Sequence, residues 1–512
     1  MIQFEQIPDS ICVPGSYVEF DGTGARTGQA GKKYSIAVLG TKLPEGTAQT
    51  DVPVLVGSAL QAVTLFGAGS MLHYMSVCLF KTNSRNEVWF VPQDADTAGI
   101  ARVMTVDYTT VYSAASTRAG LEKLYVAETE YRLPIAIGDT AVNVADWMAQ
   151  IINADLSRLF DAEAAAGVLT LTARTAGEMM NDVQVVPQYA HGDYSPAGKF
   201  VTVVETTPGM GNPSVAAAIA SLSTMGITHV VNPYNDATNY ALLLGEAQDR
   251  WGPLPSATSL GNGQEDFIVF GAYRGTEAEF RSFMETRNSE YFTTAFVEPG
   301  QTINGVQYSG LPSTSWQYAA AYAAKSADLA SVVCNNPHQA VALSCIKPAP
   351  MATRAHWNLR NRVACTYGGA TYNYNASQQV MIEAAITERT TTDTGAATDA
   401  ERRVETQLAK SYLRWSVRAM LDTVYPRSRL ADDGTPGLPA NVATPSMIKG
   451  SIIALCKNVW VPNGIVENFK NFKETILVER STSDCNTIKF QIFPDLVNIL
   501  TVKAGRISYI VC

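Results

Sequence analysis

The sequence predicts a multidomain α/β protein, and three patterns along the chain support this fold class. Between residues 205 and 297, short apolar runs alternate with amphipathic helical stretches, which is the order of a parallel α/β sheet. Residues 100–204 carry strand-like runs around one amphipathic helix, as expected for an inserted β-rich domain. Residues 476–511 contain strand after strand, which predicts an α+β C-terminal domain with an extended end.

The composition is that of a folded protein with several domains. A chain of 512 residues is too long for one hydrophobic core, and 46% hydrophobic with 17% charged residues is typical of a globular protein. We find no apolar run near the length of a membrane span and no leader after Met1, so neither membrane insertion nor secretion is expected. The eight cysteines form no C-x-x-C pair, which predicts buried thiols in a reducing compartment.

These features divide the chain into six predicted units. They are an N-terminal extended arm, the first part of the α/β core, an inserted peripheral β-rich domain, an α/β domain, a C-terminal domain and a C-terminal strand arm, at residues 1–25, 26–99, 100–204, 205–350, 351–498 and 499–512. In the arm, prolines and glycines exclude a helix, and Ser16–Phe20 alternates like one short strand. The first part of the core is predicted to hold a buried strand and two helices, at Ser35–Gly40, Ser58–Leu65 and Met71–Phe80.

The inserted domain is predicted from its strands and its single helix. The strand-like runs are Val103–Val111, Glu122–Ala127, Tyr131–Ile137, Val168–Ala173 and Asp182–Val186. In the helix, one apolar stripe follows helical spacing through Val144, Trp147, Met148, Ile151 and Ile152. These elements can form a small core of their own, which indicates a domain at the periphery.

The α/β domain is predicted from alternating elements. A helix is expected from Asn212 with Pro213 in its first turn, and Gly226 ends it. Thr276 and Glu279 form a capping box that opens another helix. The remaining predicted strands and helix are Ile227–Val231, Asp236–Arg250, Phe267–Ala272 and Tyr291–Val297.

The C-terminal domain is predicted to contain the longest helix, followed by strands. Thr398 and Glu401 can form the capping box of a helix that Pro426 ends. Its apolar side is predicted to comprise Val404, Leu408, Tyr412, Trp415 and Ala419. The strands follow at Ile476–Arg480, Ile488–Ile492 and Leu500–Val511. A long, partly apolar terminal strand is an unpaired edge, which favours addition to the sheet of another subunit.

Five short motifs, in order along the chain, resemble a known family. They are Pro14–Phe20, Gly209-Met210-Gly211-Asn212-Pro213, Tyr425–Thr435, Gly464-Ile465-Val466-Glu467-Asn468 and Leu477-Val478-Glu479-Arg480. With these motifs the chain resembles the sheath proteins of contractile phage tails, in particular the Mu-like tail sheath family. The resemblance covers nearly the whole chain, and it implies that the parallel α/β domain is similar in fold to subtilisin.

The resemblance also implies a function. It describes a structural subunit that polymerises with itself as stacked hexameric rings around the tail tube protein, with the baseplate and the tail terminator as further partners. When the baseplate triggers, the sheath contracts and drives the tube through the host envelope. The expected location is the virion tail, assembled in the host cytoplasm. The sheath of a phage-tail-like bacteriocin or of a secretion system remains an alternative.

In this family the N- and C-terminal arms are expected to add strands to the sheets of neighbouring subunits, as the terminal strand indicates independently. The candidates for this strand exchange are Tyr17, Val18, Leu500, Val502, Ile507, Tyr509 and Val511.

A remote alternative is a subtilisin-like hydrolase, which needs an Asp, a His and a Ser in that order. The nearest matches are Asp393, His191 and Ser446, but His191 precedes Asp393 and the serine lacks the flanking glycine. Gly209-Met210-Gly211 lacks the third glycine of a dinucleotide fingerprint, no phosphate-binding loop motif occurs, and the histidines show no metal-ligand spacing. We therefore expect no catalytic residues, cofactor or metal, and no nucleic acid partner, because no basic cluster contains interleaved aromatic residues.

The charge distribution suggests a surface that meets the tube. Residues 401–512 carry 15 Lys and Arg against 10 Asp and Glu, whereas the whole chain has a net charge of −9. On the long helix, four basic residues are expected along one side and could hold an acidic tube: Arg403, Lys410, Arg414 and Arg418. An ordinary solvated helix face is the alternative.

Overall fold

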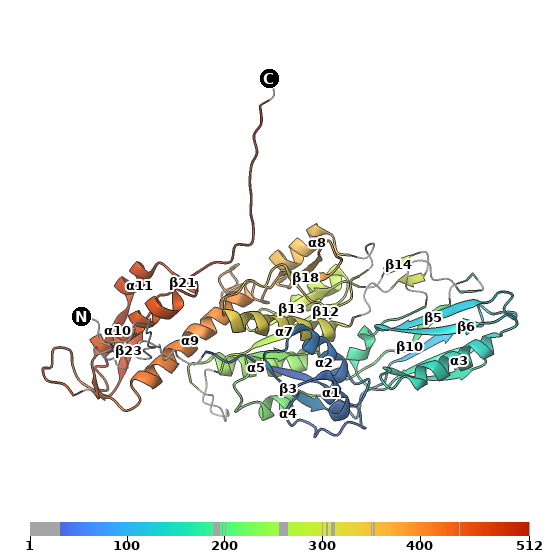
Figure 1. Cartoon of the computed structure of the whole chain (residues 1–512), viewed down its shortest axis with the longest axis horizontal. Helices are drawn as coiled ribbons and strands as arrows, with labels where there is room; N and C mark the ends of the chain where they lie inside the picture. The colour runs from blue at the N-terminus through green and yellow to red at the C-terminus, as the bar shows by residue number, and fades with distance from the viewer. Residues whose placement is uncertain are drawn as a thin grey trace, which may run out of the picture.

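The computed structural model describes residues 31–187, 195, 196, 198, 199, 201–254, 265–299, 301–303, 306–308, 313–349, 351, 354–439 and 441–510. The predicted arm at residues 1–25 lies outside them, and with it Tyr17 and Val18. Figure 1 shows an elongated molecule. The β-rich stretch lies at one end, the parallel sheet in the middle and the C-terminal helices at the other end.

The centre of the molecule is a six-stranded sheet in the order β13-β12-β11-β1-β3-β2. Its strands are β1 (Ser35–Thr41), β2 (Val54–Leu55), β3 (Glu87–Gln93), β11 (His229–Val231), β12 (Ile268–Arg274) and β13 (Phe292–Val297). All neighbours pair in parallel except β2, which is antiparallel to β3. Every residue of β1 and β13 is buried, as expected for a sheet covered on both faces. The predicted parallel α/β sheet is confirmed.

Helices cover this sheet, and most begin where the sequence predicts. They are α1 (Ala59–Phe66), α2 (Met71–Thr82), α4 (Ala216–Ser221), α5 (Ala237–Trp251), α6 (Glu277–Met284) and α7 (Ser315–Val332). The capping box of Thr276 and Glu279 at α6 is confirmed. The helix predicted from Asn212 to Gly226 is wrong in length, since α4 spans only Ala216–Ser221; the Asn239 side chain takes up the Pro213 carbonyl before it, which a longer helix would use as an acceptor.

The β-rich stretch forms two further sheets, β10-β4-β8-β7 and β6-β5-β9. Its elements are β4 (Val103–Asp107), β5 (Gly120–Val126), β6 (Thr129–Ile135), α3 (Ala141–Ala154), β7 (Phe160–Ala165), β8 (Val168–Ala173), the 3-10 helix η1 (Glu178–Asp182), β9 (Val185–Pro187) and β10 (Thr202–Thr207). In the part of the chain that the structure describes, none of these strands pairs with the central sheet. On α3, Val144, Met148 and Ile152 are buried as predicted, but Trp147 is 37% exposed.

The C-terminal half contains α9 (Val404–Val424), the longest described helix, and several small sheets. The remaining elements are β14 (Gln301–Ile303), β15 (Val306–Tyr308), β16 (Val341–Ala342), α8 (Trp357–Arg362), the π-helical turn η3 (Val363–Tyr367), β17 (Thr371–Tyr374), β18 (Val380–Ala384), β19 (Arg429–Leu430), β20 (Val442–Ala443), α10 (Pro445–Leu455), the π-helical turn η4 (Cys456–Trp460), β21 (Val466–Glu467), α11 (Phe469–Thr475), β22 (Leu477–Arg480), β23 (Ile488–Gln491) and β24 (Asp495–Leu496). The capping box predicted for Thr398 and Glu401 is wrong. Helix α9 begins only after Arg403, because the Glu401 carboxylate binds Lys410 instead.

The cysteines correct another expectation. Cys78 and Cys345 form a disulfide that joins α2 to the segment after β16, so these two are not free thiols. Cys334 and Cys456 are free and buried as predicted, whereas Cys365 and Cys485 are exposed. Cys12 and Cys512 lie outside the described residues. Among the described residues, no helix is both long and apolar enough to cross a membrane.

Candidate assembly surfaces

The terminal segment, residues 500–510, leaves the molecule as an extended chain, and no strand of the described residues pairs with it (Figure 1). Its side chains are exposed along its whole length, with exposed fractions of 64% for Leu500, 78% for Val502, 92% for Ile507 and 83% for Tyr509. It leaves where the Gln339 amide donates to the Leu500 carbonyl, at 2.7 Å. The predicted terminal strand is therefore extended but has no strand partner in the described part of the chain, and Val511 lies outside that part.

Strands β22 and β23, which precede β24 and this segment in the chain, form a hairpin with open edges among the described residues. β22 and β23 pair antiparallel, from Leu477 opposite Gln491 to Arg480 opposite Ile488. Within the described residues, no third strand pairs with either of them. The hairpin also exposes apolar side chains, with Leu477 at 58% and Phe490 at 39%. A two-stranded sheet of this kind is marginal alone and is a template for further strands.

A buried tryptophan fixes the hairpin unit to the long helix. Trp460 has no exposed surface, and its indole N–H donates to Ser416 Oγ of α9 at 3.0 Å. Its ring stands edge-on to Phe472 of α11, with 5.8 Å between the ring centroids. Since β22 packs on α10 and follows α11, the hairpin is positioned relative to α9.

The basic residues of α9 are in part already engaged within the chain. Lys410 Nζ lies 2.7 Å from Glu401 Oε1, and Arg414 Nη1 lies 2.7 Å from Asp266 Oδ1. Both cations also lie over the Trp251 ring, at 5.8 Å for Lys410 and 5.6 Å for Arg414. The structure thus places these two side chains near the same ring, where Arg414 pairs with the distant Asp266 and Lys410 pairs with Glu401 just before α9. Contact with a tube stays a prediction for all four basic residues, Arg403, Lys410, Arg414 and Arg418.

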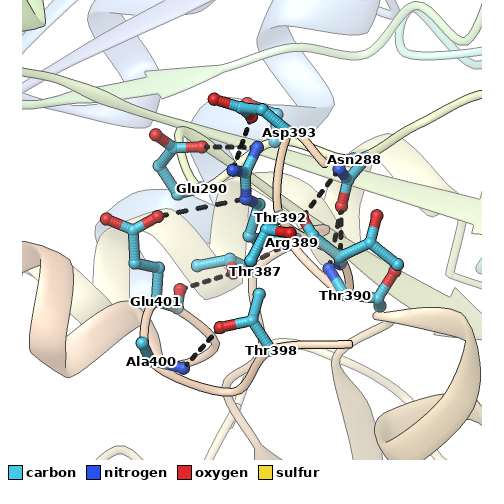
Figure 2. A network of polar contacts seen from close by, with 12 residues as sticks. Asn288, Glu290, Thr387, Arg389, Thr390, Thr392, Asp393, Thr398, Ala400 and Glu401 are labelled. Carbon is cyan, nitrogen blue, oxygen red and sulfur yellow. Dashed lines mark hydrogen bonds and ion pairs between the residues drawn. The ribbon is translucent and has the colours of Figure 1, made fainter. Parts of the chain in front are cut away.

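A polar network secures the segment in front of α9 (Figure 2). Arg389 lies between three carboxylates, 2.7 Å from that of Asp393, 3.8 Å from that of Glu290 and 4.0 Å from that of Glu401. Beside it, Asn288 Oδ1 accepts the N–H groups of Thr390 and Thr391. The network connects the loop before β13 to residues about a hundred positions later. No sequence pattern signals it, because its members come from distant loops.

A buried cluster elsewhere contains the residue types of a hydrolase, but a substrate could not reach it. Ser326 Oγ lies 2.8 Å from His338 Nε2, and His338 Nδ1 lies 3.3 Å from Glu405 Oε1. Ser326 and His338 are fully buried, inside α7 and the loop that follows it, so no substrate reaches the hydroxyl. His229 is 3.2 Å from the same hydroxyl, and burial lowers the pKa of His229 to about 3, which keeps this imidazole neutral.

The residues considered for a subtilisin-like triad do not support one either. Asp393 belongs to the exposed loop of Figure 2, where it pairs with Arg389. Ser446 lies in the first turn of α10, and His191 is outside the described residues. In the described part of the chain, no group of three or more His, Cys, Asp or Glu side chains could hold a metal ion.

Comparison with known proteins decides the family. No family model matches the chain. The chain is 32% identical over 511 residues to the Mu-like prophage FluMu tail sheath protein of Haemophilus influenzae, with 99% of each protein covered. The chain belongs to the Mu-like tail sheath family. It is a structural protein and not an enzyme, in agreement with the inaccessible Ser326 cluster.

Two solved structures resemble this sheath protein over nearly its whole length. A chain of the anti-feeding prophage baseplate in its contracted state superposes with a TM-score of 0.50 at 12% identity, over 98% of this chain and 99% of that one. The sheath tail protein of Desulfitobacterium hafniense gives a TM-score of 0.49 at 12% identity, over 94% and 97% of the two chains. The first of these shows that the mixed α/β, multi-sheet fold of the sheath protein is shared.

Proposed function

We propose that this protein is the repeating subunit of a contractile tail sheath, which polymerises as stacked hexameric rings around a tail tube. Contraction of the sheath drives the tube through the host envelope. The full-length relationship to a named tail sheath protein supports the proposal. The proposed partners are other copies of the chain, the tube protein, the baseplate and the tail terminator, in a virion tail assembled in the host cytoplasm.

The observation that carries the proposal is that one chain has both a segment that can add to a sheet as a strand and a sheet edge that can receive such a strand. The terminal segment exposes a full set of backbone donors and acceptors together with apolar side chains. The β22–β23 hairpin of the same chain offers two unpaired edges among the described residues. Since both lie at the C-terminal end, the terminal segment of one copy adds to the hairpin of the next, through Leu500, Val502, Ile507, Tyr509 and Val511. Tyr17 and Val18 take the same role in the N-terminal arm.

Such links explain how the sheath rearranges without coming apart. The sequence has no nucleotide-binding loop, so the work of contraction comes from contacts between subunits that re-form in a lower-energy arrangement. Strands exchanged between subunits keep their backbone hydrogen bonds while the packed surfaces slide. The parallel α/β domain, which we propose to be similar to subtilisin, moves as the rigid part of each subunit.

The contact with the tube is proposed to involve the basic residues of α9. Arg403 has no ion-pair partner among the described residues, so it offers its charge directly to an acidic tube. Lys410 and Arg414 would have to exchange partners with Glu401 and Asp266. Exposed ion pairs contribute only about 0–1 kcal/mol each, which suits a contact that releases on contraction.

The simplest test is electron microscopy of the purified full-length chain in negative stain. We expect rings or tubes with sixfold symmetry, formed without added nucleotide or metal. Particles of single-chain size at all protein concentrations would contradict the proposal.

A further inference from the structure

The disulfide between Cys78 and Cys345 joins two parts of the chain that are 267 positions apart. Cys78 lies in α2 and is only 2% exposed, whereas Cys345 is half-buried in the turn that follows β16. The two Cα atoms are 5.1 Å apart, which is within the range that a disulfide bridges without movement of the backbone. The bond can therefore close in a subunit that has already folded.

The turn that holds Cys345 also connects the central sheet to the β-rich stretch. On one side, the Leu343 N–H donates to a carbonyl of β18 at 2.9 Å. On the other, the Lys347 N–H donates to Ser313 Oγ at 3.1 Å, and the Lys347 ammonium donates to the Glu128 carbonyl at 2.9 Å. Glu128 lies between β5 and β6. A bond from Cys345 to α2 thus secures a turn on which the β-rich stretch rests.

The other described cysteines are not suited to the same reaction. Cys334 and Cys456 are free and buried, and burial raises the pKa of Cys334 to about 12 and that of Cys456 to about 11. These two thiols therefore stay protonated and unreactive. Cys365 and Cys485 are exposed, but neither has a partner cysteine among the described residues. The pair of Cys78 and Cys345 is the place where the described fold positions two thiols for each other.

The redox state of this pair depends on where the protein is. Thiol reductants in a cytoplasm keep cysteine pairs reduced, whereas disulfides persist outside the cell. A small oxidant can reach the Cys345 sulfur from solvent, because this residue is half-buried and lies in a turn. Thr82 Oγ1 lies 3.3 Å from the same sulfur and 2.9 Å from the Cys78 carbonyl, so polar groups of α2 surround the pair.

We propose, on the basis of the function proposed above, that Cys78 and Cys345 remain thiols while the sheath assembles in the host and form their disulfide after the particle is released. In this step both S–H bonds break and one S–S bond forms. Dissolved dioxygen accepts the two electrons and the two protons and becomes hydrogen peroxide. The bond then fixes the turn of Cys345 to α2, and the long loop that it closes strongly restricts the unfolded chain. The subunit is thus strengthened after assembly, when the particle has to persist outside the cell.

The first test counts thiols in the full-length chain before and after release. Producing cells and purified, air-exposed particles are quenched in acid and alkylated with N-ethylmaleimide in denaturant, and the peptides are measured by mass spectrometry. Cys78 and Cys345 should be alkylated almost completely in the cells, and their alkylation should fall about tenfold or more in the particles. Cys365 and Cys485 should be alkylated in both samples and serve as internal standards.

The second test compares the reduced and the oxidised chain in the same state of assembly. Closing the bond should raise the midpoint of thermal unfolding by about 5 °C and slow amide exchange of residues 341–349 about tenfold. Cys345→Ser should abolish both differences. Cys365→Ser, the same change at an exposed free thiol, should retain them. If Cys345→Ser does not fold, the two redox forms of the wild type decide the question.

Three results would overturn the proposal. A disulfide already present in acid-quenched cells would place its formation before release. Free Cys78 and Cys345 thiols in air-exposed particles would show that the bond does not form. Equal unfolding midpoints and equal exchange in the two redox forms would show that the bond does not secure the turn. The thiol count and the unfolding midpoint are read without reference to polymerisation, so a lack of rings or tubes contradicts the proposed function and is distinguished from a failure of the redox step.

Discussion

Removing the terminal segment should separate folding from assembly. We consider a chain that ends at Leu500, so that the hydrogen bond from Gln339 is retained. The residues removed are exposed in the single chain, with exposed fractions of 78% for Val502 and 92% for Ile507. Their loss should therefore change the free energy of unfolding of the monomer by no more than about 0.5 kcal/mol.

Assembly should respond far more strongly. A side chain of this size contributes about 1.5–3 kcal/mol when it moves from water into a packed sheet. If only two of the removed side chains are buried in a neighbour, the lower figure gives about 3 kcal/mol per subunit. We use the lower figure because the truncated chain also avoids the entropy cost of ordering the segment. A change of about 3 kcal/mol corresponds to a roughly hundredfold higher critical concentration for polymerisation.

The measurement is sedimentation across a range of protein concentrations, with circular dichroism for folding and electron microscopy for the pelleted material. Lys503→Gln in the full-length chain is the matched control, since it removes a charge from the segment but no apolar surface. It should polymerise like the wild type at moderate salt. Tubes of normal length from the truncated chain at the wild-type concentration would refute strand exchange through this segment.

Three further predictions follow from the contacts described above. Arg414→Ala should lower the free energy of unfolding by about 1–3 kcal/mol in a urea titration, because it leaves the buried Asp266 carboxylate without its partner, whereas Lys410→Ala should cost at most about 1 kcal/mol. Arg403→Glu should weaken co-sedimentation with tail tubes at low salt and leave tube-free polymerisation unchanged. Replacing residues 101–209 with a short Gly-Ser linker should leave a soluble, polymerising chain, as judged by sedimentation and microscopy, because Ile100 and Met210 already form a backbone bridge.

The fold could be predicted best where local pattern and tertiary packing agree. The strands of the central sheet are mostly apolar, and the cap residues Ser58, Asp236 and Thr276 mark the helix starts that the structure has. Helix α7 was missed although Thr314 and Gln317 form a capping box at its start, because it is buried on nearly all sides and its alanines form no apolar stripe. Strand β7 was missed because its alanine and acidic residues have low strand propensity.

The candidate surfaces could be predicted only in part. The terminal segment was found because its apolar pattern is local, and the basic residues of α9 were placed on one side of the helix by their spacing. Their partners could not be found, since Asp266 lies 148 positions before Arg414 and only the fold brings the two together. The same holds for Glu401, whose spacing from Thr398 suggested a cap although Lys410 competes for its carboxylate.

The terminal strand pattern therefore carries information about the polymer and not about the single chain. Among the described residues of one subunit, no strand pairs with residues 500–510, and the side chains that alternate along them stay in water. A sequence that only had to fold as a monomer would replace such side chains or cover them, because an exposed apolar edge invites aggregation. The hairpin of β22 and β23 lacks what the terminal segment could supply, because a sheet of two strands is marginally stable by itself. Only when a second copy is present can the terminal segment of one chain pair with the hairpin of another. Assembly is thus favoured by the apolar side chains and the strand edges that remain exposed after the single chain has folded.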